Sequence, residues 1–151
     1  MTIIAFKDGI MAADSVCWSG GRAQPVPFPK ITRAPDGSLV ALAGKLHDSW
    51  LLRKWVLAGM PDEKPAFTGV GEDEPYILMA KPDGSLWFSK ANLDFAPEPQ
   101  PSCMGAGNAS TFCEGAMEAG LSAYDAVKLT IRHHDGAGGE AQVERVCGPD
   151  L

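Results

Sequence analysis

The order of the segments predicts an α+β fold, a four-layer αββα sandwich in which two antiparallel sheets lie between helical layers. Apolar runs typical of short strands come first and are followed by one helical segment. A second block of strands then precedes two more helical segments and a closing strand. Strands and helices are thus segregated in blocks, whereas a doubly wound parallel sheet needs them to alternate. The chain also contains 12 prolines and 17 glycines, which is typical of many short strands joined by turns.

Three turns between apolar runs predict β-hairpins. The first is Asp8-Gly9, and the other two repeat the sequence Pro-Asp-Gly-Ser at 35–38 and 82–85. Pro presets the first position of such a turn, and Gly takes the positive φ that the turn requires. The strands predicted on this basis cover residues 2–6, 10–13, 31–33, 39–43, 76–80, 86–89 and, at the end of the chain, 142–146. Residues 15–29 are expected to form a loop or an irregular edge, and residues 93–101 an extended loop.

Three segments have the apolar spacing and end signals of helices. Asp48 is a candidate N-cap for the first, over residues 48–59, and Gly59 with Pro61 ends it. Small residues at 107–119 predict a second helix, and Gly105-Ala106-Gly107 is interpreted as the turn before it. Ser122 and Asp125 resemble a capping box at the start of a third helix, which continues through Arg132.

Composition excludes several classes of function. The 151 residues suit a single domain spanning 1–151, and their formal net charge of −6 without a basic stripe argues against nucleic-acid binding. The sequence shows neither a signal peptide nor a run of transmembrane length. The cysteines at 17, 103, 113 and 147 lack the CxxC spacing of a zinc site, so we expect reduced thiols in a cytoplasmic protein with no metal and no cofactor.

Four residue types with particular separations carry a family resemblance. Thr2 begins the first predicted strand, Asp14 follows the second, Lys30 comes sixteen positions after Asp14, and Gly44 comes fourteen after Lys30 at the end of an apolar strand. This pattern resembles the N-terminal half of proteasome β-subunits and of HslV, which are N-terminal-nucleophile (Ntn) hydrolases. The resemblance runs in order through nearly the whole chain and is firmest over residues 2–44. It implies the αββα Ntn-hydrolase fold.

The resemblance also implies a role for each of the four residues. A threonine hydroxyl is a poor nucleophile unless a base takes its proton, and a free α-amine at Thr2 can be that base. Removal of Met1, which methionine aminopeptidase allows before a small residue, would expose the amine. A Lys30 ammonium would lower the pKa of both amine and hydroxyl, Asp14 would hold Lys30, and the Gly44 N–H would face the oxyanion.

Three further positions match the family less closely. Gly105-Ala106-Gly107 resembles the family's Gly-Ser-Gly, with Ala106 in the place of the serine. The sequence from His134 to Gly139 resembles an Asp-x-x-Ser-Gly-Gly motif. When it is aligned on the glycine pair, His134 replaces the aspartate, and a shift by one residue puts Asp135 there instead. The accessory hydrogen bonds around the threonine are therefore expected to be fewer than in the family.

The function implied is threonine-type hydrolysis of amides, with peptides or unfolded proteins as substrates. By the same resemblance the partners are further copies in a homo-oligomeric ring and an ATP-dependent unfoldase. One alternative is an inactive or weakly active Ntn-fold protein with a structural or assembly role, for instance in a phage. Another is a small-amide Ntn hydrolase that acts outside any ring. Each of the four residues also has a plain structural interpretation when taken alone, for example Lys30 as a surface lysine.

Overall fold

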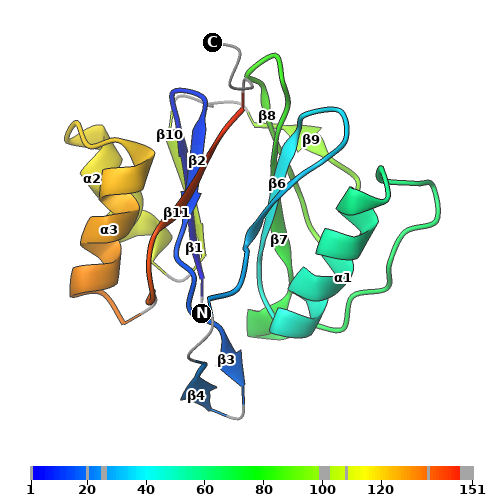
Figure 1. The fold of residues 1–151 in the computed structure, drawn as a ribbon, viewed down its shortest axis with the longest axis horizontal. Coiled ribbons are helices and arrows are strands. Elements are labelled where there is room, and N and C mark those ends of the chain that lie inside the picture. The colour runs from blue at the N-terminus through cyan, green and yellow to red at the C-terminus, as the bar shows by residue number, and fades with distance from the viewer. Residues whose placement is uncertain are drawn as a thin grey trace.

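The computed structural model describes residues 2–19, 21–24, 27–98, 103–107, 109–135 and 137–146. Two antiparallel β-sheets face each other in the middle of the molecule, and helices cover the outer face of each (Figure 1). The fold is therefore the predicted αββα sandwich. Among the described residues, no helix is long and apolar enough to cross a membrane.

The first sheet has the strand order β10-β1-β2-β11. It joins the N-terminal hairpin to two strands from the end of the chain, and all its pairings are antiparallel. Its strands are β1 (Ile3–Lys7), β2 (Ile10–Ala13), β10 (Cys103–Gly107) and β11 (Gln142–Arg145). Ile4 lies opposite Ala13 on β2 and opposite Ala106 on β10, so β1 is a central strand.

The second sheet has the order β5-β6-β7-β8-β9 and is built from consecutive hairpins. Its strands are β5 (Ile31–Arg33), β6 (Leu39–Ala43), β7 (Tyr76–Ala80), β8 (Leu86–Ser89) and β9 (Ala96–Pro97). A separate short hairpin of β3 (Trp18–Ser19) and β4 (Arg22–Ala23) lies below the two sheets, near the N-terminus (Figure 1).

Three α-helices form the two outer layers. Helices α2 (Ser110–Glu118) and α3 (Ala123–His133) cover the first sheet, and α1 (Leu46–Leu57) covers the second. A short 3₁₀ turn at Gly71–Asp73 precedes β7. The capping box predicted for α3 is present, since the Ser122 hydroxyl accepts a hydrogen bond from the Asp125 N–H at 3.1 Å.

Alternate residues of the strands enter different cores, as the period of two requires. Ile4 and Phe6 of β1 lie between the sheets, whereas Ile3 and Ala5 face α2 and α3. On β6, Val40 packs toward α1. The position before Ile3 therefore faces the space between the sheets, and this is where Thr2 lies.

Two local predictions from the sequence are wrong, and the extended loop expected over residues 93–101 contains the short edge strand β9. Residues 105–107, interpreted as a turn, belong to strand β10, and α2 begins only at Ser110. Strand formation is decided here by pairing with β1, which no local pattern in a Gly-rich segment reveals.

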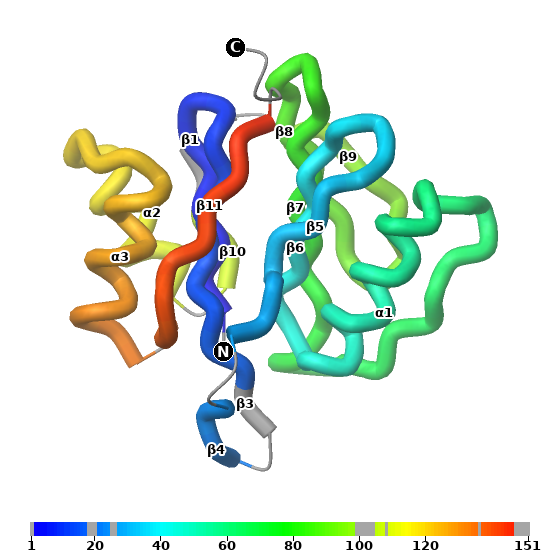
Figure 2. Tube along the Cα trace, viewed as in Figure 1, coloured from blue at the N-terminus to red at the C-terminus, as the bar shows by residue number. Residues whose placement is uncertain are grey.

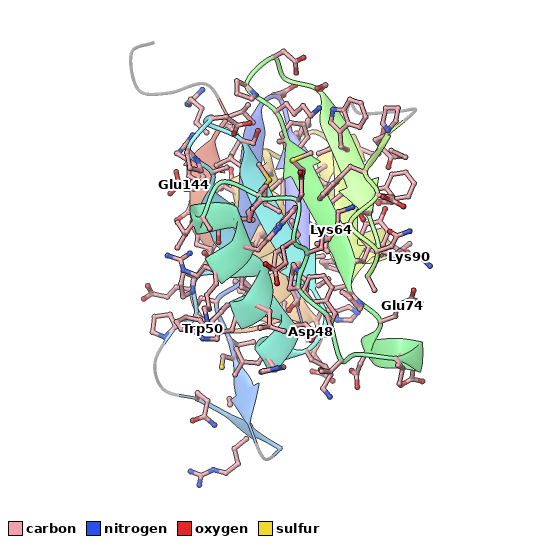
Figure 3. The ribbon with its side chains drawn as sticks, turned by 90° about the vertical axis from the view of Figure 1, so that its right-hand side faces the viewer. Asp48, Trp50, Lys64, Glu74, Lys90 and Glu144 are labelled. Carbon is pink, nitrogen blue, oxygen red and sulfur yellow. The ribbon has the colours of Figure 1, made fainter. Side chains whose placement is uncertain are left out.

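Asp48 is the second wrong prediction, because it is not the N-cap of α1. The helix begins at Leu46, and Asp48 lies fully buried in its first turn (Figure 3). Its carboxylate accepts hydrogen bonds from Thr68 N, Thr68 Oγ1 and Gly69 N at 2.8–3.0 Å. A Cβ on Gly69 would overlap the Asp73 carbonyl, so only glycine fits there. Asp48 thus fastens the segment after α1 to the start of that helix.

Candidate active site

The N-terminal hairpin places Thr2 beside Asp14. The Asp14 N–H donates to the Ile3 carbonyl at 3.2 Å, and the Ile3 N–H donates back to Asp14 Oδ1 at 3.0 Å. Thr2 is nine-tenths buried and Asp14 fully so. The hairpin register therefore fixes both side chains at the end of the first sheet, facing the second.

Lys30 reaches this pair from the second sheet. It immediately precedes β5, and its Nζ donates to Asp14 Oδ1 at 2.8 Å and to Thr2 Oγ1 at 3.2 Å. The Lys30 side chain is itself buried. Three residues that are separated in the sequence thus form one chain of hydrogen bonds, from Asp14 through Lys30 to the Thr2 hydroxyl.

Thr2 lines two pockets. One, of about 230 Å³, is lined by Thr2, Lys30 and Gly44 together with residues of the segment between β2 and β5, of the start of α1 and of the 3₁₀ turn before β7: Val16, Cys17, Phe28, Lys45, Leu46, Ser49 and Asp73. The other, of about 460 Å³, is lined by Thr2, Ala43, Gly44, Glu72, Asp73, Glu74, Tyr76 and Gly107. Thr2 and Gly44 border both pockets.

Gly44 lies where β6 ends and α1 has not yet begun. A Cβ at this position would approach the Leu42 side chain at 3.1 Å and the Pro75 backbone at 3.3 Å. Such contacts are tighter than ordinary van der Waals distance, so a larger residue would push the backbone away from its neighbours. The glycine allows the main chain itself to line the pockets.

The loop before β11 closes around Asp14. Gly138 N donates to Asp14 Oδ2 at 3.0 Å, and the Gly138 carbonyl accepts from the N–H groups of Ser15 and Val16. The Ser15 hydroxyl accepts from Glu140 N at 2.9 Å. Asp14 therefore receives hydrogen bonds on both carboxylate oxygens, which fixes the orientation of the acid that holds Lys30.

Gln142, at the start of β11, is the residue of this region that sequence patterns did not indicate. Its Nε2 donates to the carbonyls of Asp14 and Phe28 at 3.0 and 2.9 Å, and its Oε1 accepts from Lys30 N at 3.0 Å. All three partners belong to segments more than 100 residues earlier in the chain. Only the tertiary structure brings them together.

Burial lowers the pKa of Lys30 below the ordinary lysine value of 10.5, and the neighbouring Asp14 and Cys17 offset this effect only in part. The physical reason is that the low-polarity surroundings disfavour the ammonium form. When charged, Nζ donates to Thr2 Oγ1. When neutral, it can accept a proton from the same oxygen.

Stability is expected to rise with pH through the titration of Lys30. Because the pKa is lower in the folded than in the unfolded protein, the unfolded state binds more protons between the lowered value and 10.5. The free energy of unfolding should therefore increase over that alkaline window, and below it the burial penalty is fully present. The increase should be measurable by urea unfolding against an Asp14→Asn/Lys30→Met double variant, which lacks both charges. Parallel pH profiles for the two proteins would contradict this expectation.

The fold of this chain is similar to that of known structures. BPH from Thiobacillus denitrificans, solved in complex with epoxomicin, superposes with a TM-score of 0.68 at 21% sequence identity, over 97% of this chain and 99% of that one. Eukaryotic HslV from Trypanosoma brucei superposes with a TM-score of 0.66 at 15% identity, over 95% and 98%. The chain has the HslV-like Ntn-hydrolase fold. No protein-family model matches its sequence, and no curated protein matches it either.

The three accessory residues considered from the sequence occupy different places in this Ntn-hydrolase fold. Ala106 is buried between the sheets opposite Ile4. His134 is the C-cap residue that follows α3, with its ring 6.0 Å from that of Phe112 on α2, and Asp135 is exposed. In this part of the chain it is Gly107, next to Ala106, that lines a pocket with Thr2.

Gly107 is held to glycine by its close approach to β1. Its φ is +106°, and a Cβ would overlap the Thr2 carbonyl. The end of β10 can therefore pair with the start of β1 only if residue 107 has no side chain.

Within the described residues, no group of three or more His, Cys, Asp or Glu side chains could hold a metal ion.

Proposed function

We propose that this protein is a threonine-type amide hydrolase whose nucleophile is Thr2, with Asp14, Lys30 and Gly44 as the other catalytic residues. The observation that carries the proposal is the position of Lys30 Nζ, which is 3.2 Å from Thr2 Oγ1 and 2.8 Å from Asp14 Oδ1, beside a threonine that lines two pockets. A hydroxyl with a base within hydrogen-bond reach, oriented by a third group, is the arrangement that nucleophilic catalysis needs.

The steps follow from this arrangement. Thr2 Oγ attacks the amide carbon, and its proton passes to the free α-amine of Thr2 or to neutral Lys30. The negative charge develops on the carbonyl oxygen, where the Gly44 N–H would donate. The proton then moves to the leaving amine as the C–N bond breaks, which leaves an ester on Thr2. Water attacks the ester, releases the carboxylic acid and restores the hydroxyl.

The nature of the substrate and the assembly belong to the same proposal. The two pockets beside Thr2 suit an extended peptide rather than a small amide, because a peptide continues beyond the scissile bond in both directions. The likeness in fold to HslV supports a cytoplasmic homo-oligomeric ring that receives unfolded protein from an ATP-dependent unfoldase. Sedimentation of the protein as a monomer at micromolar concentration would contradict the ring.

The direct test is the state of the N-terminus together with peptide turnover. Removal of Met1 should give a mass that begins at Thr2. This form should hydrolyse peptides much faster than a form with Met1 retained, because only a free α-amine can serve as a base and the nitrogen of a peptide bond cannot. The control is a variant with a large residue inserted between Met1 and Thr2. This residue blocks the aminopeptidase, so Met1 is retained and the Thr2 nitrogen stays in a peptide bond. Absence of turnover in a protein with a free Thr2 would favour an inactive Ntn-fold protein, whereas turnover of small amides alone would favour the small-amide hydrolase.

A further inference from the structure

The carboxamide of Gln142 forms hydrogen bonds with the main chain of both segments that carry the site, the end of β2 and the residues before β5. It donates to the Asp14 carbonyl at 3.0 Å and to the Phe28 carbonyl at 2.9 Å, and it accepts from Lys30 N at 3.0 Å. A glutamine is well suited to this place because its side chain has both donor and acceptor groups at one end. Removal of the side chain would leave all three partly buried main-chain groups without this partner.

These bonds join the two sheets. Gln142 is paired with Ala13 on β2 in the first sheet, whereas Phe28 and Lys30 lead into β5 of the second. Figure 2 shows β11 running along β2, with β5 across from it in the other sheet. Gln142 therefore determines how the segment that carries Lys30 lies against the strand that leads to Asp14.

The ion pair alone does not settle the position of Lys30. It fixes the Nζ atom, but four methylene groups with rotatable bonds separate that atom from the main chain. The link from Asp14 to Lys30, residues 15–29, is also long, and the regular elements in its described part are the two short strands β3 and β4. An anchor on the main chain of Lys30 is thus a separate requirement for a defined distance between Nζ and Thr2 Oγ1.

We propose that Gln142 is a positioning residue of the hydrolase, which keeps Lys30 Nζ in reach of the Thr2 hydroxyl by holding the main chain of Lys30 against that of Asp14. The proposal rests on the proposed function. Gln142 is not among the described residues that line either pocket beside Thr2. Its loss should therefore lower kcat and leave KM nearly unchanged.

Arg33 provides a matched control, because it bridges the same two strands away from the site. Its Nη2 donates to Glu144 Oε2 at 3.0 Å and to the Arg145 carbonyl at 2.7 Å, so it also joins β5 to β11. Glu144 lies in the upper half of the molecule, far from the β3–β4 hairpin below the sheets (Figure 3). If hydrogen bonds between β5 and β11 served only to hold the sheets together, loss of those at Arg33 would affect hydrolysis in the same way as loss of those at Gln142.

The kinetic test compares Gln142→Leu with Arg33→Leu in peptide hydrolysis, with urea unfolding of each. Misplacement of a catalytic group by about 1 Å lowers rates roughly 10²-fold, so we expect a kcat loss on the order of 10- to 100-fold for Gln142→Leu, with KM within about twofold. Arg33→Leu should keep kcat within about threefold. The proposal would be overturned if the kcat loss in each variant simply followed its loss of stability, with no extra loss in Gln142→Leu.

A second readout does not depend on turnover. The titration of Lys30 can be followed by NMR of ¹³Cε-labelled lysine, with the signal assigned by its absence in Lys30→Arg. In Gln142→Leu the ammonium should be better hydrated, so its pKa should rise toward the ordinary lysine value, whereas Arg33→Leu should titrate like wild type. An unchanged Lys30 titration in folded Gln142→Leu would refute the positioning role.

The two readouts separate the two hypotheses. If wild-type protein with a free Thr2 hydrolyses nothing, the proposed function fails, but the Lys30 titration still decides whether Gln142 positions Lys30. If Gln142→Leu does not fold, Gln142→Asn replaces it in both experiments. The asparagine side chain stays polar but is too short to bond to Lys30 N. Both kcat and the Lys30 pKa should therefore change in the same direction as in Gln142→Leu.

Discussion

Replacing Thr2 with alanine is expected to lower peptide hydrolysis by a factor on the order of 10⁴ or more while the protein stays folded. The Thr2 hydroxyl accepts a hydrogen bond from Lys30 Nζ, and Thr2 lines both pockets. Without it no acyl-enzyme can form. Thr2→Ser, which keeps a hydroxyl, should retain measurable turnover.

The measurement is initial-rate hydrolysis of a fluorogenic peptide, with covalent labelling by epoxomicin followed by mass spectrometry. Labelling with epoxomicin tests the proposed function, since this compound is the ligand in the BPH structure. Thr130→Ala is the matched control, since Thr130 is also a buried threonine but donates to the Ala126 carbonyl within α3. If Thr2→Ala hydrolyses peptides as fast as Thr130→Ala does, Thr2 is not the nucleophile.

Replacing Asp14 with alanine is expected to cause the largest loss of stability, about 3–5 kcal/mol in the free energy of unfolding. Asp14 is fully buried, and its carboxylate accepts from Lys30 Nζ, Ile3 N and Gly138 N. The variant would keep a buried ammonium without its counter-charge and two main-chain donors without an acceptor. Hydrolysis should be lost as well, because Lys30 Nζ would lose the carboxylate that orients it beside Thr2 Oγ1.

Urea unfolding followed by circular dichroism measures this loss. The Asp14→Ala/Lys30→Met double variant should be more stable than Asp14→Ala alone, since it removes the unpaired buried charge. Asp94→Ala is the control for an exposed pair: it removes the partner of Lys64 at 3.3 Å, where the Asp94 side chain is 77% exposed, and should change stability little. An unfolding midpoint for Asp14→Ala equal to that of wild type would show that the ion pair contributes nothing to stability.

The hairpins and helices could be predicted from the sequence because their signals are local. The turns at Asp8-Gly9 and in the two Pro-Asp-Gly-Ser segments each join neighbouring strands, and the Ser122 cap acts within one helical turn. Asp48 shows the limit of such signals. The same residue type can cap a helix from outside or, as here, sit within its first turn and bind a loop twenty residues away. Only the packing of that loop against α1 distinguishes the two.

By itself, the sequence determined the order of the elements and the separations among Thr2, Asp14, Lys30 and Gly44, because strand alternation, turn chemistry and residue spacing are properties of short segments. The tertiary structure decided that Gly105–Gly107 would be a strand, that two pockets would lie beside Thr2, and that Gln142 would tie Lys30 to Asp14. The physical reason is that these features depend on hydrogen bonds between segments about 100 residues apart. Such bonds form only after both sheets have assembled. No local pattern in the sequence predicts them.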